Sequence, residues 1–205
     1  MEIPDGFILA GGGSSRMGER KERLMFGGRT FLRNAFDIVS EAFGGGVTIV
    51  GKQIEAINFA NVIPDELPDG IPLNNKAAII GLFTALKNSR TEWTLIFACD
   101  LPFVNKELLQ RLWNFVDEEF GAIVPVQPDG RLQPLCAFYR TEKCLPKIAS
   151  AIKNGTWSLH RLMENIDIRR VEFSAINDLS GSEFFFQNIN TPDDLRRAIE
   201  SRSAG

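Results

Sequence analysis

The stretch FILAGGGSSRMG, residues 7–18, joins a short apolar run to a glycine-rich loop, and Lys21 follows a few residues later. Glycine reaches positive φ and lets the backbone come close to an anion. Successive backbone N–H groups in such a loop can form a concave anion site, and Arg16 and Lys21 can neutralise phosphate charge. The stretch therefore predicts a polyphosphate-binding loop at the end of a β-strand. The loop residues are Gly11, Gly12, Gly13, Ser14 and Gly18.

Two well-known phosphate loops differ from this one. Gly13 and Gly18 have the spacing of a P-loop, but Glu19 and Arg20 follow where that motif needs Lys and Ser or Thr. The dinucleotide-binding motif G-x-G-x-x-G lacks its third glycine, because Arg16 stands at that position. These departures disfavour a P-loop NTPase and leave an NAD(P)-dependent oxidoreductase as a distant alternative. An ordinary strand-to-helix turn does not require three consecutive glycines beside clustered cations.

Apolar runs of strand length alternate with segments of helical periodicity along the chain. The expected strands are Phe7–Ala10, Val47–Val50, Val62–Ile63, Thr94–Cys99, Ala122–Val126, Leu135–Tyr139 and Ile168–Phe173. Helical spacing of apolar residues covers 31–43, 108–116 and 144–152, and Thr191-Pro192-Asp193-Asp194 indicates the start of a last helix. This alternation predicts an α/β fold with a mainly parallel sheet. No repeat or long linker divides the chain, so we expect one domain over residues 1–205.

Composition and charge exclude several classes of function. The 205 residues carry a net charge of −3, which disfavours nonspecific binding of nucleic acid or of an anionic membrane surface. No apolar run approaches the ~18 residues of a transmembrane helix, and the N-terminus lacks a signal-peptide pattern. Cys99, Cys136 and Cys144 show no C-x-x-C spacing, and the single histidine, His160, argues against a zinc site. We therefore expect buried free thiols in a reducing cytoplasm.

Two carboxylates follow expected strands directly. Asp65 comes after Val62–Ile63 and one proline, and Asp100 comes after Thr94–Cys99. Ligands of open parallel sheets bind beyond the carboxyl ends of the strands. Mg²⁺ takes only one or two protein carboxylates beside phosphate oxygens and waters, so Asp100 is the better metal candidate. The plainer alternatives are a turn-forming Asp100 before a proline and a loop-capping Asp65.

Several motifs together resemble one known family, the molybdenum cofactor guanylyltransferases. The N-terminal motif L-A-G-G-x-S-x-R-M-G starts at Leu9 and is followed by Lys21, whereas related cytidylyltransferases usually begin L-A-A-G. Cys99-Asp100-Leu101-Pro102 is similar to the family's C-D-x-P, and residues 188–195 to its N-x-N-T-P-x-[DE]-L. The segment 133–137 resembles a P-L-x-A segment, which implies no more than pocket lining. The resemblance implies a Rossmann-like three-layer α/β/α nucleotidyltransferase fold.

The resemblance also implies a reaction, namely Mg²⁺-dependent transfer of GMP from GTP to molybdopterin or its molybdenum form, with release of pyrophosphate. Arg16 and Lys21 would stabilise the triphosphate charge, and Asp100 would hold the metal. Asp65 would contact the nucleotide. A molybdoenzyme or its chaperone is the partner that the family implies. The remaining nucleotide or acceptor contacts would come from Leu9, Ala10, Gly11, Gly12, Gly13, Ser14, Gly18, Asn188 and Asn190.

The chain departs from the family pattern in two places. Arg20 stands where Asp is usual, and the stretch 77–81, AAIIG, replaces a usual G-P-L-A-G beside the nucleotide and acceptor sites. Two alternatives therefore stay open. One is a related nucleotidyltransferase that uses CTP or another phosphorylated acceptor, and the other is a non-catalytic regulator that binds GTP. The oligomeric state has no visible sequence signal.

Overall fold

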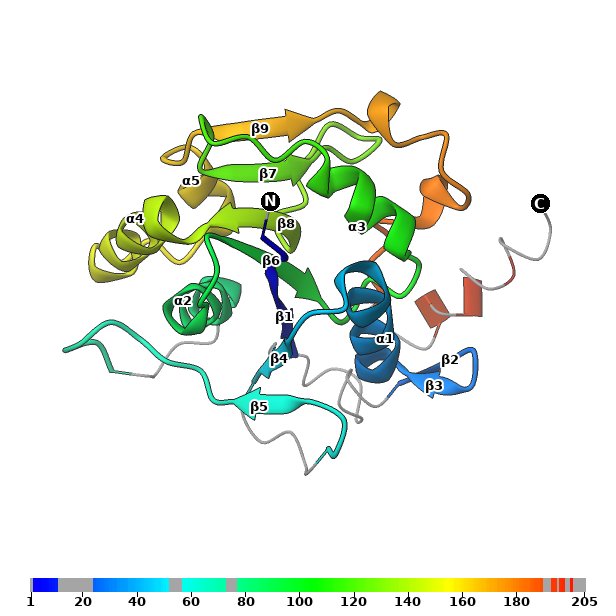
Figure 1. The fold of residues 1–205 in the computed structure, drawn as a ribbon, viewed down its shortest axis with the longest axis horizontal. Coiled ribbons are helices and arrows are strands. Elements are labelled where there is room, and N and C mark those ends of the chain that lie inside the picture. The colour runs from blue at the N-terminus through cyan, green and yellow to red at the C-terminus, as the bar shows by residue number, and fades with distance from the viewer. Residues whose placement is uncertain are drawn as a thin grey trace.

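A seven-stranded sheet forms the centre of the molecule. The computed structural model describes residues 2–10, 24–51, 57–72, 77–189, 193, 194, 196, 197 and 200. In this part of the chain the strand order is β5-β4-β1-β6-β8-β7-β9 (Figure 1). The strands are β1 Asp5–Leu9, β4 Val47–Val50, β5 Asn61–Ile63, β6 Trp93–Ala98, β7 Ala122–Pro125, β8 Cys136–Arg140 and β9 Ile168–Val171.

Only β8 runs against its neighbours in this sheet. It pairs antiparallel with both β6 and β7, whereas β1 with β4, β1 with β6, β4 with β5 and β7 with β9 pair in parallel. The prediction of a mainly parallel sheet is therefore confirmed. As a consequence, the carboxyl ends of six strands and the beginning of β8 lie along one edge of the sheet.

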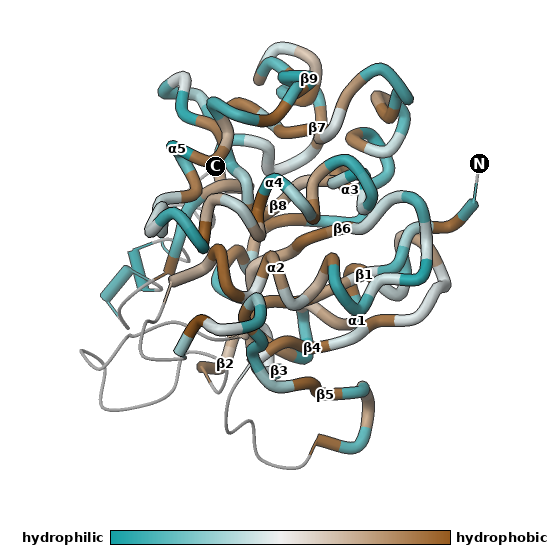
Figure 2. The backbone as a smooth tube through the Cα atoms, turned by 90° about the vertical axis from the view of Figure 1, so that its left-hand side faces the viewer, coloured by the Kyte–Doolittle hydropathy of each residue, from teal (hydrophilic) through white to brown (hydrophobic). Residues whose placement is uncertain are grey.

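Helices cover both faces of the sheet and complete three layers (Figure 1). One face carries α1 Phe31–Phe43 and α3 Lys106–Trp113, and the other carries α2 Ala78–Asn88, α4 Thr141–Lys153 and α5 Leu159–Met163. Every residue of β6 is buried, as expected for a strand covered on both faces. Leu95 and Phe97 pack toward α1 and α3, while Ile96 packs toward α2 and α4. Figure 2 shows hydrophobic stretches along the central strands and largely hydrophilic outer turns.

Local signals explain where α1 and α3 begin. The side chain of Thr30 accepts a hydrogen bond from the Arg33 N–H, and the side chain of Asn105 accepts one from the Leu108 N–H, so both helices have an N-cap. α1 ends at Gly44, whose φ of 64° is left-handed. α1 coincides with the expected segment 31–43, whereas α3 covers Lys106–Trp113 instead of 108–116. α3 starts two residues before the periodic apolar stretch because its cap is Asn105.

Some elements differ from the sequence expectation. A short hairpin joins β2 Met25–Phe26 to β3 Arg29–Thr30, and its turn uses Gly27 and Gly28 with φ of 58° and 82°. β9 ends at Val171 rather than at 173, because Phe173 begins a 3₁₀ helix. Asp193, Asp194, Arg196 and Arg197 are helical, but the expected cap at 191 and 192 lies outside the described residues. No described helix combines the length and hydrophobicity needed to cross a membrane.

Candidate active site

The carboxyl edge of β1, β4, β5 and β6 carries Leu9, Ala10, Asp65 and Asp100 of the expected site. Backbone pairing continues one residue past these strands. The Ala10 N–H donates to the Val50 carbonyl at 2.9 Å, and the Cys99 N–H donates to the Leu9 carbonyl at 3.3 Å. Ala10 is therefore the fixed exit from β1 into the glycine loop. The loop itself, from Gly11 to Arg23, lies outside the described residues, so the predictions for Arg16, Lys21 and the glycines remain predictions.

Leu9 and Ala10 present backbone rather than side chain to this edge. Both side chains are buried, and the expected backbone contacts to a ligand remain predictions. The Leu9 side chain faces α2, where a Cβ added to Gly81 would lie 3.2 Å from both Leu9 Cδ atoms. Gly81, the one glycine kept from the usual G-P-L-A-G, thus lets the start of α2 approach the end of β1 closely.

Asp100 lies two residues beyond the end of β6 and is partly exposed. Its carbonyl accepts a hydrogen bond of 3.2 Å from the Ile189 N–H, which brings Asn188 beside it from the far end of the chain. Ile189 is fully buried in a small cluster with Leu24 and Phe103. The structure therefore brings Asp100 and Asn188 together, next to the point where the chain re-enters after the glycine loop. The expected partner Asn190 lies outside the described residues.

Asp65 lies at the same edge but three strands away from Asp100. With about 4.8 Å between neighbouring strands, the ends of β5 and β6 are roughly 14 Å apart. A single metal ion cannot take both carboxylates across such a distance. Among the described residues there is no group of three or more His, Cys, Asp or Glu side chains placed to hold a metal. Asp65 and Asp100 are therefore too far apart to share one metal ion.

The residue after Asp65 is clamped to α2. The Glu66 N–H donates to Thr84 Oγ1 at 2.8 Å, and the Glu66 carboxylate accepts from Lys87 Nζ at 2.6 Å and from Asn88 Nδ2 at 2.9 Å. The hydrogen bond from Lys87 is the main cause that lowers the pKa of Glu66. Thr84 is fully buried and its hydroxyl also contacts the Ile80 carbonyl at 2.9 Å. Sequence analysis did not identify this clamp, because a contact across 18 residues leaves no local pattern.

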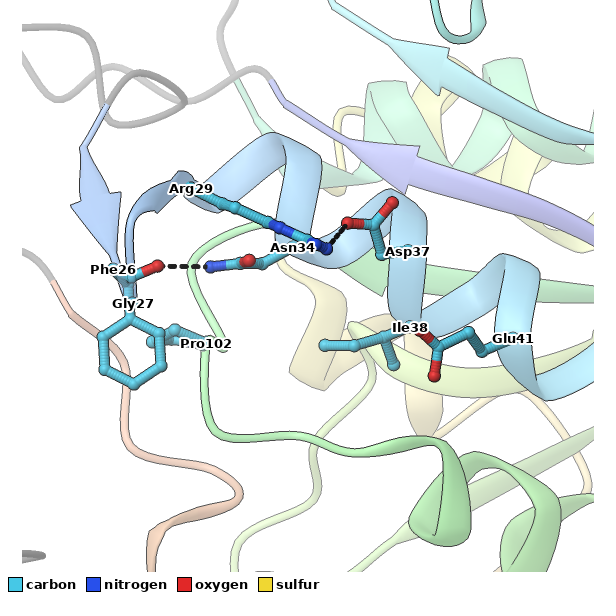
Figure 3. A pocket seen from close by; sticks show the side chains of 8 residues that line it. All are labelled: Phe26, Gly27, Arg29, Asn34, Asp37, Ile38, Glu41 and Pro102. Carbon is cyan, nitrogen blue, oxygen red and sulfur yellow. Dashed lines mark hydrogen bonds and ion pairs between the residues drawn. The ribbon is translucent and has the colours of Figure 1, made fainter.

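An open pocket of about 400 Å³ lies beside this edge, between the β2–β3 hairpin, α1 and the segment after Asp100 (Figure 3). Several of its polar groups are already paired, since Arg29 pairs with Asp37, Asn34 Nδ2 donates to the Phe26 carbonyl at 3.0 Å, and Glu41 pairs with Lys106. None of the expected site residues that the structure describes lines it. The lining residues are Phe26, Gly27, Arg29, Asn34, Asp37, Ile38, Glu41 and Pro102.

The three cysteines are buried and are not joined in a disulfide, as expected. Burial raises the pKa of Cys144 to about 12 and also raises that of Cys136, so neither thiol forms a thiolate nucleophile near neutral pH. His160 is an exposed residue of α5. The described residues therefore offer carboxylates, backbone groups and amides at the sheet edge, a set suited to binding a phosphorylated ligand and a hard cation.

Curated relatives of this chain carry consistent names. A probable molybdenum cofactor guanylyltransferase of Flavobacterium johnsoniae is 32% identical over 95% of this chain and 96% of its own length. A probable molybdenum cofactor guanylyltransferase of Aquifex aeolicus is 31% identical over 94% of this chain and 89% of its own length. The molybdenum cofactor guanylyltransferase of Desulfosudis oleivorans is 25% identical over 100% of this chain and 98% of its own length.

Solved structures share the fold. Molybdopterin-guanine dinucleotide biosynthesis protein A from Archaeoglobus fulgidus superposes with a TM-score of 0.77 at 23% identity, over 98% of this chain and 100% of that one. The 2-C-methyl-D-erythritol 4-phosphate cytidylyltransferase of Thermus thermophilus superposes with a TM-score of 0.66 at 18% sequence identity, over 100% of both chains. Residues 6–170 match the family described as the MobA-like NTP transferase domain. The chain thus belongs to the MobA-like NTP transferase family and is a nucleotidyltransferase.

Proposed function

We propose that this enzyme transfers GMP from GTP to the terminal phosphate of molybdopterin or its molybdenum form and releases pyrophosphate. The names of the relatives support the reaction class. The observation that carries the proposal is the meeting of three features at one sheet edge. These are the exit of β1 into the glycine loop, Asp100 after β6, and Asn188, which the Ile189–Asp100 hydrogen bond draws in.

The chemistry is a direct displacement at phosphorus. An oxygen of the acceptor phosphate forms a bond to the α-phosphorus of GTP, and the bond from that phosphorus to the bridging oxygen of pyrophosphate breaks. The acceptor is already an anionic nucleophile, so a covalent enzyme intermediate is unnecessary. Catalysis then consists of positioning and of stabilising negative charge.

Each expected residue has a role in this proposal. The backbone at Leu9 and Ala10 contacts the nucleoside, the glycine loop wraps the phosphates, and Arg16 and Lys21 neutralise the departing pyrophosphate. Asp65, on the β5 side, contacts the nucleoside. A nucleotide lying across the strand ends would reach from Asp65 toward Asp100. Asp65 would then contact the nucleoside, while Asp100 would lie near the phosphates and hold the metal.

The metal part of the proposal rests on donor chemistry. Asp100 supplies one carboxylate. Mg²⁺ in nucleotide sites is typically held by one or two carboxylates together with substrate phosphates. When bound, Mg²⁺ supplies Lewis-acid stabilisation of phosphate charge. Asn188 lies beside Asp100 and would contact the acceptor or order water around the metal.

The product and the compartment belong to the same proposal. Three buried cysteines that form no disulfide suit a reducing compartment, so we assign the reaction to the cytoplasm. A molybdoenzyme or its chaperone would receive the guanine dinucleotide product.

One experiment tests the proposal. Pyrophosphate release is measured with Mg²⁺ and each of GTP, CTP, UTP and ATP, with and without molybdopterin. Release that requires both GTP and molybdopterin supports the guanylyltransferase function. Release with CTP favours the related cytidylyltransferase activity, for which the fold shared with a cytidylyltransferase is the supporting observation. GTP binding without release under any condition contradicts the proposal and favours a regulator.

A further inference from the structure

The connection between β7 and β8 has a rigidly held backbone at residues 133–136. The Gln133 N–H donates to the Pro125 carbonyl at 2.9 Å, and the Ala98 N–H donates to the Leu135 carbonyl at 2.7 Å. The Cys136 N–H donates to the Gln133 carbonyl at 3.3 Å and closes a turn. Bonds to β7 and β6 and this internal turn therefore fix the segment from three directions.

A buried tyrosine adds a fourth attachment. The Tyr139 hydroxyl donates to the Pro134 carbonyl at 2.8 Å, and the side chain is fully buried. Burial raises the pKa of this hydroxyl well above its usual value, so it stays a donor at physiological pH. The segment is thus held in one conformation before any ligand arrives.

Gln133 is one of few buried polar side chains, with 6% of its surface exposed. Its Oε1 accepts from the Leu135 N–H at 3.4 Å. Its Nε2 has no hydrogen-bond partner in the described part of the chain. Every fully buried side-chain nitrogen or oxygen atom in that part does have a hydrogen-bond partner. Nε2 must therefore reach solvent, and an otherwise enclosed side chain offers two unused N–H donors.

The sheet register places Gln133 at the same edge as the candidate site. Phe97 of β6 pairs with Cys136 of β8, and the Ala98–Leu135 hydrogen bond extends that pairing. Asp100 and Gln133 each lie two residues beyond this bond, at the same edge of the sheet. In the order β5-β4-β1-β6-β8-β7, Gln133 lies on the side of Asp100 away from the glycine loop.

We infer that Gln133 is a specificity-determining residue for the second substrate, whose Nε2 donates a hydrogen bond to an uncharged acceptor atom, such as a ring carbonyl oxygen, beyond the reacting phosphate. This inference rests on the proposed function, in which the nucleotide occupies the β1 side. An uncharged group is favoured because the cation in the same connection, Arg131, is already paired with Asp129 at 2.6 Å. A fixed donor discriminates well, because little side-chain freedom is lost on binding.

The test compares how substitutions of Gln133 change the binding of the two substrates. Gln133→Met removes both polar atoms at similar size, while Gln133→Glu keeps an oxygen for the Leu135 N–H and removes the amide donors. We expect each variant to raise the KM for molybdopterin roughly 3- to 10-fold, the effect of one lost neutral hydrogen bond, with an unchanged KM for GTP. Equilibrium binding of molybdopterin and of GTP, measured by calorimetry, should show the same split.

Gln127→Met is the matched control. Gln127 belongs to the same connection, and its Nε2 donates to the Leu132 carbonyl at 3.2 Å, so this variant disturbs the loop without touching the Gln133 donors. It should leave both KM values unchanged. Wild-type behaviour of Gln133→Glu, an equal rise in the KM for GTP, or the same effect from Gln127→Met would each overturn the inference.

Failure of the proposed function gives a different result. If the wild-type enzyme binds molybdopterin but releases no pyrophosphate, the proposed reaction is wrong, and the binding measurements still decide the role of Gln133. If the wild-type enzyme does not bind molybdopterin at all, both proposals are overturned.

Discussion

At the scale of single residues, the charge of Asp100 is the clearest test of the site. Asp100→Asn keeps the size of the side chain and leaves the carbonyl that accepts from Ile189 in place. Loss of a charge that stabilises a transition state reduces turnover by about 10²–10³-fold, and we expect that loss in pyrophosphate release with Mg²⁺ and GTP. Asp69→Asn, at an exposed loop position, serves as control and should keep wild-type turnover. Near-normal turnover of Asp100→Asn would remove this residue from the mechanism.

Glu66 gives the protein a predictable response to acid. Hydrogen bonds from Lys87 and Asn88 lower the pKa of Glu66 from its ordinary value of 4.5. A carboxyl whose pKa is lower in the folded state stabilises the fold above the unfolded value, and this contribution is lost as pH falls through the folded pKa. The difference in melting temperature between wild type and Glu66→Gln should therefore be constant above about pH 4.5 and shrink below it.

The partner of Glu66 supplies the control for that measurement. Lys87→Met removes the same ion pair from the other side, so its stability difference from wild type should shrink over the same pH range. We expect both differences to be small, because both side chains are partly exposed and surface ion pairs contribute little. A difference that grows as the pH falls would contradict the assignment.

The sequence predicted the site residues unevenly, for physical reasons. Leu9 ends a strand, and Ala10, Asp65 and Asp100 follow strands closely. Parallel strands of one sheet end at the same edge, so the common location of these residues was predictable. Asn188 was expected from a motif, and its position beside Asp100 needed the long-range bond from Ile189. Thr84 and Glu66 carry no such signal, since their contact depends on how a loop packs against a helix.

At the scale of elements, α2 shows where pattern analysis fails. Eight of its eleven residues are buried, so it lacks the polar face that marks an amphipathic helix. Its N-cap Ala77 also makes no side-chain hydrogen bond. By contrast, α1 and α3 have both an apolar stripe and a capping side chain, and their existence was predicted. Element boundaries were less accurate, as the end of β9 shows.

Under the proposed function, the clamp between α2 and Glu66 would make α2 a positioning element for the nucleoside side. Thr84→Val keeps the shape of the side chain but leaves the Glu66 N–H without its partner, and an unpaired buried group costs about 1–3 kcal/mol. We expect this loss in chemical denaturation, together with a higher KM for GTP and an unchanged KM for the acceptor. Thr84→Ser restores the hydroxyl and should recover the KM for GTP. An unchanged KM in Thr84→Val would show that the clamp has only a structural role.

At the scale of the whole molecule, the sequence predicted the layers but not the strand order. Alternating strands and helices require helices on both faces of a mainly parallel sheet. The insertion of antiparallel β8 between β6 and β7 depends on pairing between residues about forty positions apart, such as Phe97 with Cys136, and local periodicity does not encode such pairing. The return of Ile189 to Asp100 is of the same kind.

Ile189 links the late part of the chain to the sheet, so its removal should affect both stability and activity. Ile189→Ala truncates a fully buried side chain, which costs about 2–5 kcal/mol, and it loosens the segment that carries Asn188. Denaturation and pyrophosphate release measure the two effects. Ile176→Ala truncates another fully buried isoleucine, beside α3, and should lower stability while sparing turnover of the folded enzyme. Equal losses of turnover in both variants would contradict a local role of Ile189.

The hydrogen bond between Ile189 and Asp100 also determines when the site can be completed during synthesis of the protein chain. During translation, β1, β4, β5 and β6 leave the ribosome long before residue 189. The edge that would receive the nucleotide can therefore take shape on a nascent chain whose acceptor side is still missing. Under the proposed function, a partly synthesised chain would lack Asn188 beside Asp100, so transfer would begin only after the last segment docks.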